Sequence, residues 1–525
     1  MKMKKSILLS LVAFMIASLQ AATYRVTPDA AGGGDGQSWA TPMTIEEAIA
    51  AAKADEDTDD IILCKAGTYT PTATIAISTP MTVRGGLKGT DDEMLAENGK
   101  RSVFDTQNNT AITKVFSITT TSGLNTFEGV EVHNAYQRGF DKSNKAGSLS
   151  FKNCVFDSCG KKYKTDTTLR GSAGCFLGGG SATITFENCV FSRNSYDLSN
   201  GVNVGNGIAL AFQSCKRVII DNSLFVSNGL GRAALKSSDP AGANIKGVRG
   251  AVIYTESPLT VCNTEFRANT AGIHTGSAGA MGGIVYIKEA KGLSSFTNCL
   301  FLANSCEQCN TYGATDTKEA GVIVVRSASS STTTKDSLDV VNCTFAYNFT
   351  DGKTTSAGID VGSYTGTKAN IKNTIFYGAR KSRDPEKGRD IWVSSSCSAN
   401  IDYCLFDSDG GENTEKCIAG AGTITIGSNN VFGDPKFKFA IPAEEIDSIM
   451  VNNGSYYGYS ADAYENVFSK ADVHALSRKL TVDTGDPASP FSNEPRPNGA
   501  RVNLGYYGNT PDALSTLSGM KIIIR

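Results

Sequence analysis

One short phrase recurs along this chain, and it restricts the possible folds more than any other feature of the sequence. In this phrase apolar residues alternate with others, and then an Asn, a small residue, any residue and a Phe follow. The copies end at Phe156, Phe191, Phe225, Phe266, Phe301, Phe345, Phe376, Phe406 and, in a worn form, Phe432. Their mean spacing is about 35 residues, which indicates a repeat architecture. The irregular part of the spacing falls in stretches rich in Gly, Ser, Thr and Lys.

A second phrase lies between the copies and joins Gly to a small residue and an apolar run, as in RGAVIY, GGIVYI and AGVIVV. Each repeat therefore holds at least two short strands separated by turns. Such strands have one apolar face that a single repeat cannot bury. Stacked repeats would place each Phe about 4.8 Å above its equivalent and form one apolar column. The sequence thus predicts an all-β, single-stranded solenoid: a parallel β-helix, right-handed by the chirality preference of parallel connections.

The polar positions of the phrase fit this stacking. The Asn is expected at a turn, where it would bond to the Asn of the next coil in a ladder. The expected members are Asn153, Asn188, Asn222, Asn263, Asn298, Asn342 and Asn373, with Tyr403 breaking the pattern. The next position holds Cys, Ser or Thr, which indicates a small, buried site. We therefore expect core thiols at Cys154, Cys189, Cys299, Cys343 and Cys404.

A propeller is the alternative architecture, because a period of about 40 residues suits one blade. A blade would need four strands and tight hairpin turns marked by pairs such as Asn-Gly. These hairpin signals do not recur regularly in the sequence. The solenoid is therefore the preferred interpretation.

The ends of the chain depart from the repeat and predict caps. Thr44-Ile-Glu-Glu47 forms a capping box, and Ile45, Ala48, Ile49 and Ala52 share one face of the helix that it opens. A helix there would plug the open end of the apolar column. Beyond Phe432 the phrase is lost, and the chain indicates an irregular closing cap. The predicted segments are a signal peptide (1–22), the N-terminal cap and first coils (23–102), the β-helix repeats (103–433) and the C-terminal capping region (434–525).

The first residues indicate export. Lys2, Lys4 and Lys5 precede an apolar stretch, and Ala21 and Ala22 offer a cleavage site. The apolar stretch is shorter than the roughly 20 residues that a membrane span needs. No later segment is apolar enough to cross a membrane. We therefore expect a protein that is secreted or associated with the cell surface or outer membrane.

The charge balance excludes one class of partner. Lys and Arg together number 50, and Asp and Glu number 52. No long basic run breaks this balance, so the electrostatic footprint of a nucleic-acid-binding protein is missing. We expect no nucleic-acid partner and a monomeric chain.

Several stretches resemble known families. FSRN, FVSN, FRAN, FLAN and FAYN resemble the Phe-x-x-Asn repeat of polymorphic outer membrane proteins, and Gly282-Gly283-Ile284 and Gly250-Ala251 stand where those proteins carry Gly-Gly-Ala. The opening stretch from Tyr24 looks like the N-terminal cap of secreted pectin-lyase-like right-handed β-helix proteins. The closing stretch from Asp483 is similar to a C-terminal cap of bacterial β-helix proteins. The resemblance implies the fold, which hosts lyases, hydrolases, epimerases, adhesins and inert spacers.

Metal-binding signals are sparse. Cys306-x-x-Cys309 is the best loop pair of cysteines, either a local disulfide or half of a metal site, but no second Cys or His pair completes a zinc site. Asp407-Ser-Asp409-Gly-Gly-Glu412 resembles a calcium loop in composition and lacks EF-hand spacing. The acidic segment 55–60 is expected to be a solvated turn. We expect no cofactor, with Ca²⁺ as the one ion that the composition leaves open.

A catalytic set cannot be assigned from the sequence. A polysaccharide lyase needs cations to neutralise a uronate carboxylate and a base to remove the adjacent proton. Lys246 and Arg249, before a strand, and His133, in an early coil, are the candidates, and each is interpreted as a solvated residue of a coil. The mixed-charge run 380–390 is interpreted as an exposed loop. Paired carboxylates for glycoside hydrolysis would have to come from different coils.

Two functions remain open at this stage. The first is a non-enzymatic, adhesin-like or glycan-contacting scaffold, which the regular repeats and the missing catalytic motifs favour. The second is a polysaccharide lyase or glycoside hydrolase of the pectin-lyase-like fold acting on acidic polysaccharide, which the caps and the long face of such a solenoid favour. The expected partner in both is a polysaccharide or a cell-surface glycan.

Overall fold

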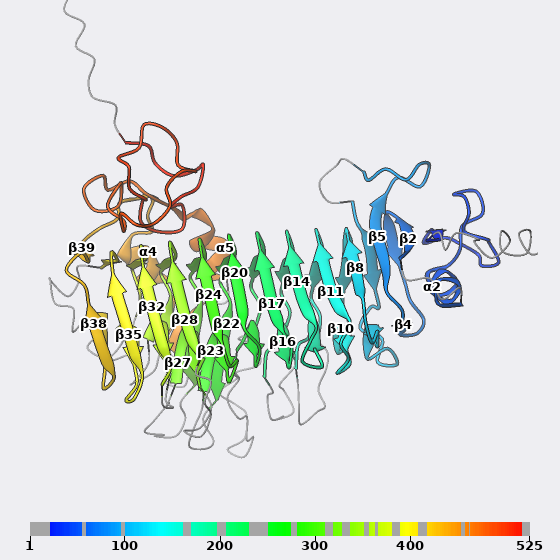
Figure 1. Cartoon of the computed structure of the whole chain (residues 1–525), viewed down its shortest axis with the longest axis horizontal. Coiled ribbons are helices and arrows are strands. Elements are labelled where there is room, and N and C mark those ends of the chain that lie inside the picture. The colour runs from blue at the N-terminus through cyan, green and yellow to red at the C-terminus, as the bar shows by residue number, and fades with distance from the viewer. Residues whose placement is uncertain are drawn as a thin grey trace, which may run out of the picture.

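The structure is a computed structural model in which successive coils lie side by side along one axis (Figure 1). It describes residues 21–54, 59–95, 100–160, 170–196, 206–229, 250–274, 281–309, 319–327, 336–350, 356–362, 366–380, 389–407, 417–452, 457–460 and 462–516. The predicted signal peptide therefore lies almost entirely outside the described residues, and the predicted segment boundaries stay a prediction. No helix among the described residues is long and apolar enough to cross a membrane.

Three long parallel sheets form the walls of the solenoid. In each sheet a strand pairs with its equivalent in the preceding and following coil. Sheet A consists of β1 (Thr23–Val26), β2 (Asp60–Lys65), β5 (Met81–Leu87), β8 (Leu124–Glu128), β11 (Ser148–Lys152), β14 (Thr183–Glu187), β17 (Arg217–Asp221), β20 (Leu259–Cys262), β24 (Leu293–Thr297), β28 (Ser337–Val341), β32 (Lys368–Lys372), β35 (Ser398–Asp402) and β38 (Thr423–Ile426).

Sheet B carries the Phe of the repeated phrase. It consists of β3 (Gly67–Tyr69), β6 (Ser102–Asp105), β9 (Val130–His133), β12 (Val155–Asp157), β15 (Val190–Ser192), β18 (Leu224–Val226), β21 (Glu265–Arg267), β25 (Leu300–Leu302), β29 (Thr344–Ala346), β33 (Ile375–Tyr377), β36 (Leu405–Phe406) and β39 (Val431–Phe432).

Sheet C holds the Gly-and-apolar phrase. It consists of β4 (Ile75–Ile77), β7 (Lys114–Ile118), β10 (Arg138–Lys142), β13 (Gly174–Leu177), β16 (Leu210–Gln213), β19 (Ile253–Thr255), β23 (Met281–Lys288), β27 (Glu319–Arg326), β31 (Ser356–Val361), β34 (Arg389–Val393) and β37 (Ile418–Gly420). A short fourth sheet of β22 (Thr270–His274), β26 (Ser305–Cys309) and β30 (Phe349–Thr350) lies between sheets B and C along the chain.

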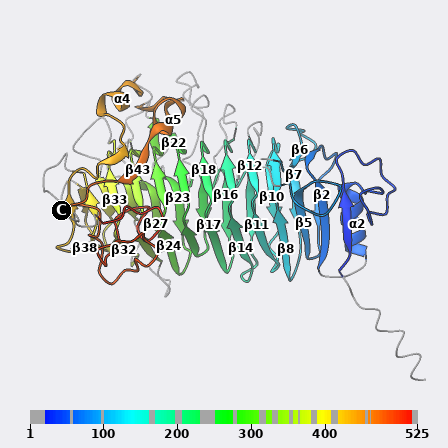
Figure 2. The ribbon, with the colours of Figure 1, turned by 90° about the horizontal axis from the view of Figure 1, so that it is seen from above.

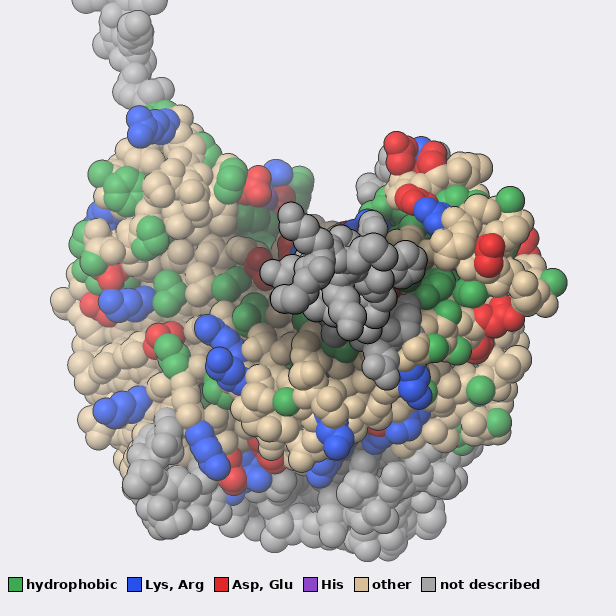
Figure 3. All heavy atoms as spheres, turned by 45° about the vertical axis from the view of Figure 1, so that its right-hand side comes forward, with side chains coloured by type: hydrophobic (Ala, Val, Ile, Leu, Met, Phe, Trp, Pro, Cys, Tyr) green, Lys and Arg blue, Asp and Glu red, His purple; other side chains and the backbone are tan. Residues whose placement is uncertain are grey.

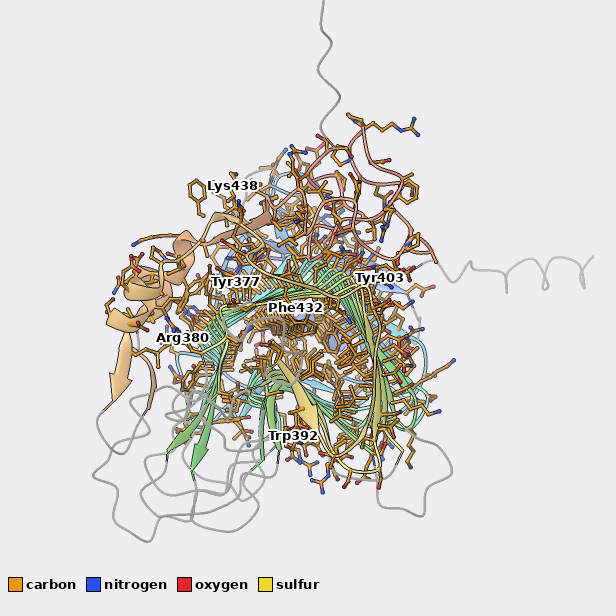
Figure 4. The ribbon with its side chains drawn as sticks, turned by 90° about the vertical axis from the view of Figure 1, so that its left-hand side faces the viewer. Tyr377, Arg380, Trp392, Tyr403, Phe432 and Lys438 are labelled. Atoms are coloured by element: carbon orange, nitrogen blue, oxygen red, sulfur yellow. The ribbon has the colours of Figure 1, made fainter. Side chains whose placement is uncertain are left out.

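The winding is right-handed, as predicted. Figure 4 looks at the C-terminal end of the solenoid, and the last coils pass from Tyr377 through Arg380 and Trp392 to Tyr403, counter-clockwise. Because the chain advances toward the viewer in this direction, the coil is a right-handed helix. The fold is therefore the predicted right-handed parallel β-helix, and the propeller is excluded.

The predicted Phe column runs through the core behind sheet B. From Phe156 to Phe406 every successive ring stacks on the previous one, with ring centroids 4.5 to 5.2 Å apart. Phe432, in the worn copy, follows at 6.0 Å. Offset stacking of aromatic rings adds to the free energy gained from their burial.

The predicted Asn ladder was assigned to the wrong set of asparagines. The seven turn asparagines all have φ between 45° and 53°, the left-handed conformation that Asn tolerates better than most residues. Their side chains lie outside the column, and only Asn188 and Asn222 bond to each other (2.5 Å). Asn298 and Asn342 instead donate to the carbonyl of Gly508. These asparagines are therefore selected by their backbone conformation. Asn373 also donates to Ser489 (2.9 Å), so three of the last ones anchor the C-terminal region.

The continuous ladder is formed by the Asn of the Phe-x-x-Asn phrases. These residues are fully buried, and each Nδ2 donates to the Oδ1 of the next at 2.9 to 3.1 Å; they are Asn194, Asn228, Asn269, Asn304 and Asn348. The same Oδ1 also accepts the backbone N–H of the preceding ladder residue, as Asn228 does from Asn194 (3.1 Å). Buried polar groups require such partners, so each coil depends on its neighbours.

The predicted core thiols are confirmed. All five are buried, and the thiol of Cys189 donates to the Phe151 carbonyl. Burial raises the pKa of Cys404 to about 12. Ser223 and Thr264 occupy the same slot and donate to the carbonyl two residues earlier, which explains why these three residue types exchange there.

The N-terminal helix follows its prediction. In α2 (Ile45–Ala54), the Thr44 N–H donates to the Glu47 carboxylate (3.0 Å) and the Glu47 N–H donates to Thr44 Oγ1 (3.2 Å), which is the reciprocal capping box. Ile45, Ala48, Ile49 and Ala52 are all buried and belong to the main core. The helix contacts β1, β2 and β4 and so covers the N-terminal end of the column.

The chain beyond Phe432 is irregular, as predicted, but it covers the side of the last coils. Its elements are β40 (Phe437–Phe439), α4 (Ala443–Ser448), β41 (Met450–Asn452), β42 (Tyr457–Tyr459), α5 (Ala463–Asn466), the 3₁₀ helix η3 (Phe468–Lys470) and β43 (Asp472–Ala475). Ile446, Tyr459 and Phe468 pack on Leu302 and Tyr347 of the sheet B side. Figure 2 shows α4, α5 and β43 over the C-terminal half of the solenoid.

Substitutions of the two kinds of Asn should lower the free energy of unfolding by different amounts. Asn228→Ala should lower the free energy of unfolding by about 3 kcal/mol, because it leaves buried groups of Asn194 and of the Phe191 carbonyl without partners. Asn222→Gly should cost less than about 1 kcal/mol, because Gly keeps the left-handed turn and only an exposed hydrogen bond is lost. Urea denaturation followed by circular dichroism measures both. Equal costs would contradict the buried ladder.

Candidate functional site

The outer face of sheet B changes character along the solenoid. The Phe of each strand points inward, so the residues directly before and after it point outward. In the C-terminal half these outward residues are apolar and buried under the C-terminal region, as at Leu300, Leu302, Ile375 and Leu405. In the N-terminal half the same two rows are not buried under the described part of the C-terminal region.

We call the uncovered part, from β6 to β21, the open stretch of sheet B. The residues before the inward position are Val103, Glu131, Val155, Val190, Leu224 and Glu265, and those after it are Asp105, His133, Asp157, Ser192, Val226 and Arg267. Figure 3 shows this side of the molecule hollowed between the C-terminal region and the N-terminal coils.

Asp157 is the centre of a polar cluster on the open stretch. Its side chain is only 4% exposed and accepts two hydrogen bonds from Arg193, at 2.8 and 2.7 Å. The hydroxyls of Ser192 (2.6 Å) and Ser158 (3.0 Å) donate to the same carboxylate. Burial disfavours ionisation of Asp157, but these hydrogen bonds outweigh it and hold its pKa below the usual value.

His133 joins this cluster, which corrects its interpretation as a solvated residue. The side chain is 33% exposed, and Nε2 lies 2.9 Å from Asp157 while Nδ1 lies 3.9 Å from Asp105. The register of β6, β9 and β12 places the three side chains in one row on adjacent coils. The imidazole therefore lies between two carboxylates of the neighbouring coils, closer to Asp157.

Glu131 lies beside this row and has the opposite electrostatic environment to Asp157. Burial raises its pKa, and the positive charges of Arg101 and Arg193 offset part of that effect. The two carboxyl groups are on adjacent coils, since Val155, two residues before Asp157, pairs with Glu131. One face of the sheet thus holds a carboxyl with a raised pKa beside one with a lowered pKa.

A second polar group closes the far end of the open stretch. Glu265 is ion-paired with Arg267 and accepts a hydrogen bond from the Tyr506 hydroxyl (3.0 Å) of the C-terminal region. Burial lowers the pKa of Arg267, but the hydrogen bond and charge of Glu265 outweigh it and raise the pKa above its usual value, and Tyr464 in α5 adds to this effect. The C-terminal region therefore supplies aromatic side chains to the rim of the open stretch.

Between the two groups lies an apolar strip. Val155, Val190 and Leu224 succeed one another in a single row and are partly exposed. Glu131 and Glu265 end this row four strand spacings apart, or about 19 Å. The arrangement offers apolar contact along its length and hydrogen-bonding groups at both ends, which is the usual composition of a small-molecule site.

Most candidates from the sequence lie elsewhere. Lys246, Arg249, Asp409, Glu412 and the centre of the run 380–390 are outside the described residues. Arg380 forms an ion pair with Asp447 of α4 (2.9 Å). Asp407 accepts the N–H of Gly378 (2.9 Å).

Two of the predicted loops are corrected. Cys306 and Cys309 belong to β26, a strand, and the buried Cys306 thiol donates to the Gly321 carbonyl (3.2 Å). Asp60 is not part of a solvated turn: it is fully buried at the start of β2 and accepts the Ala22 N–H (2.8 Å), while residues 55–58 are outside the described part. Among the described residues, no group of three or more His, Cys, Asp or Glu is placed to hold a metal ion.

The sequence reasoning missed Glu131, Asp157 and Arg193. The signal that could have found them is the register: Asp157 directly follows the Phe of its copy, and Arg193 follows the next Phe by two residues. Position relative to Phe fixes which residues face outward, so reading all copies in one alignment would have placed these charges on one face.

Comparison with known proteins gives similarity of fold. No family model and no curated protein matches the chain. Among solved structures, pectate lyase Pel9A aligns over 93% of this chain and 96% of its own, with 14% identity and a TM-score of 0.40. The surface adhesin PfbA of Streptococcus pneumoniae aligns over 84% of this chain and 98% of its own, with 14% identity and a TM-score of 0.34. The resemblance to polymorphic outer membrane protein repeats stays a prediction.

The cluster around Asp157 predicts a pH-dependent stability difference. Asp157 stabilises the folded chain above its unfolded pKa, and this contribution disappears as the pH falls through its lowered folded pKa. Arg193→Gln removes the guanidinium that donates two hydrogen bonds to the buried Asp157 carboxylate and should cost about 1–2 kcal/mol at pH 7. The difference from wild type should shrink below about pH 4, where Asp157 becomes protonated in the variant.

Urea midpoints measured from pH 3 to pH 7 test this. Gln keeps the same unfavourable positive φ (54°) that Arg193 has, so the backbone is matched. Lys152→Gln, which removes an ion pair between exposed side chains at 3.6 Å on sheet A, is the control and should change stability little at any pH. A difference that does not depend on pH would contradict the role assigned to Asp157.

Proposed function

We propose that this protein is an exported, non-enzymatic β-helix protein that binds a glycan chain along the open stretch of sheet B. The proposal rests on the difference between the covered and the uncovered part of the outer face of sheet B. The outward rows are apolar where the C-terminal region covers them, and elsewhere they carry charged and polar side chains around a short apolar strip. A face built only to be solvated would not need the partly exposed Val155, Val190 and Leu224.

The chemistry of the open stretch suits a sugar. Carboxylates accept hydrogen bonds from sugar hydroxyls, and Arg donates to their oxygens. The apolar strip and the Tyr506 ring offer surfaces for the C–H faces of sugar rings. The distance of about 19 Å between Glu131 and Glu265 corresponds to a short oligosaccharide rather than to one sugar. A polysaccharide or cell-surface glycan is therefore the proposed partner.

The pairing of the charges supports binding over elimination chemistry. A lyase must direct a cation at the uronate carboxylate of its substrate. Arg193 and Arg267 are instead directed at Asp157 and Glu265 of the chain itself. Both guanidinium groups are thus held in place by carboxylates of the chain itself, which fits a preorganised binding face.

One observation favours a second function, glycoside hydrolysis. Glu131 has a raised pKa and Asp157 a lowered one, and such divergence between neighbouring carboxyls is the pattern of an acid and its partner base or nucleophile. Asp157, however, already accepts hydrogen bonds from Arg193, Ser192 and Ser158. Hydrolysis is therefore the alternative.

Binding and turnover can be tested on the mature chain with a panel of neutral and acidic oligosaccharides. Titration calorimetry should detect binding, and Glu265→Gln should weaken it about tenfold, the effect of losing one hydrogen bond to a charged group. Glu187→Gln, on sheet A away from the open stretch, is the matched control and should bind like wild type.

Reducing-end release and ultraviolet absorbance of unsaturated products should stay at background. Turnover that Glu131→Gln abolishes would overturn the non-enzymatic proposal and support hydrolysis. Absence of binding to every member of the panel, in a chain that melts cooperatively, would count against a glycan partner.

A further inference from the structure

The C-terminal end of the solenoid exposes apolar side chains that are buried in every preceding coil. Ile426 of β38 is 40% exposed, whereas its equivalents Ile401 and Ile371 are 1% and 0% exposed. Ile424 and Phe432 are likewise only partly buried in the last coil. The apolar column therefore reaches the surface at this end.

The two ends of the solenoid differ in this respect. The N-terminal end is covered by α2, whose Ile45 and Ile49 are buried in the column. At the other end, the described part of the C-terminal region packs on the outer face of sheet B and leaves β38 as the last strand of sheet A. Figure 4 shows this end facing the viewer, with Phe432 at its upper margin.

Within the part of the chain that the structure describes, the exposed strand lacks the features that normally prevent edge pairing. Edge strands of soluble proteins are usually protected by charges, especially Lys, by Pro or by a covering segment. The segment 418–430 contains neither a charged residue nor Pro, and β38 reads Thr-Ile-Thr-Ile, a sequence with high β-propensity. Its outward N–H and C=O groups are not used by a further described strand.

We propose that two copies of this chain join end to end through antiparallel pairing of their β38 strands. A two-fold axis through Thr425 places Thr425 opposite Thr425 of the second copy and Ile424 opposite Ile426. Because Ile424 and Ile426 both face the column, this register joins apolar faces to apolar faces and threonines to threonines. The expectation of a monomer is replaced by this proposal.

The geometry restricts the assembly to a closed dimer. A head-to-tail contact would need a second exposed end, and α2 occupies the N-terminal end. A contact between two copies of the same surface is isologous, and it closes after two copies. Each copy would then protect the other's edge strand and continue its apolar column.

The mass of the mature chain in solution tests the assembly. Sedimentation velocity should give twice the monomer mass, and Ile426→Lys should weaken the dimer at least about tenfold, because it places a charge in the contact. Leu293→Lys is the matched control: Leu293 is also exposed (50%) on sheet A, but it lies in β24, far from the end. A wild-type chain that stays monomeric at all concentrations would overturn the proposal.

Disulfide crosslinking tests the register. Thr425→Cys should form an intermolecular disulfide on mild oxidation, because residues directly opposite each other in an antiparallel pair have Cα atoms about 4.5–5.5 Å apart. Thr423→Cys should not, because the two positions would lie about 14 Å apart along the strands. Wild type controls for the natural thiols. Crosslinking of Thr423→Cys but not Thr425→Cys would overturn the proposed pairing.

A chain truncated after Thr516 separates the second copy from another occupant. The apolar tail 517–525 is the competing segment of this chain. If the full chain is a monomer and only the truncated chain dimerises, the tail covers the edge and the proposal is overturned. Equal dimerisation of both chains supports it.

Discussion

The stacking of each Phe on the Phe of the next coil is the interaction on which the rest of the molecule depends. One coil has short strands with a single apolar face and cannot bury that face alone. Parallel pairing in register brings the rings within 4.5 to 5.2 Å and removes them from water. A slip of one residue would turn every ring to the outside. The position of each residue relative to its Phe therefore decides whether it lies in the core, at a turn or on the surface.

The two asparagines of each repeat show how this register assigns roles. The Asn three residues before Phe stands at a left-handed turn and is selected by its backbone conformation. The Asn three residues after Phe is buried and links coil to coil through its amide. The first kind faces outward, so in the last coils it is free to bind the carbonyl of Gly508 and help hold the C-terminal region on sheet B.

That attachment also determines where the candidate site lies. The C-terminal region buries the outward rows from β25 onward and reaches β21 through Tyr506 and Tyr464. The uncovered rows carry Glu131, Asp157 and Glu265 around an apolar strip. The described part of the same region leaves the edge of β38 uncovered. The proposed glycan-binding face and the proposed dimer contact thus both depend on where the C-terminal region packs on the solenoid.

The sequence by itself determined the class of fold, the Phe column, the core thiols and the N-terminal capping box. Each of these depends on residues that are close in the chain or that recur many times, so the pattern is visible without coordinates. Only the tertiary structure showed which Asn forms the ladder and which part of the outer face of sheet B the C-terminal region covers. It also showed that His133, Asp157 and Arg193 lie close together. These contacts join residues 24 to 36 positions apart on different coils. Loops of variable length separate them, and so the register of the stacked strands, rather than spacing in the chain, brings them together.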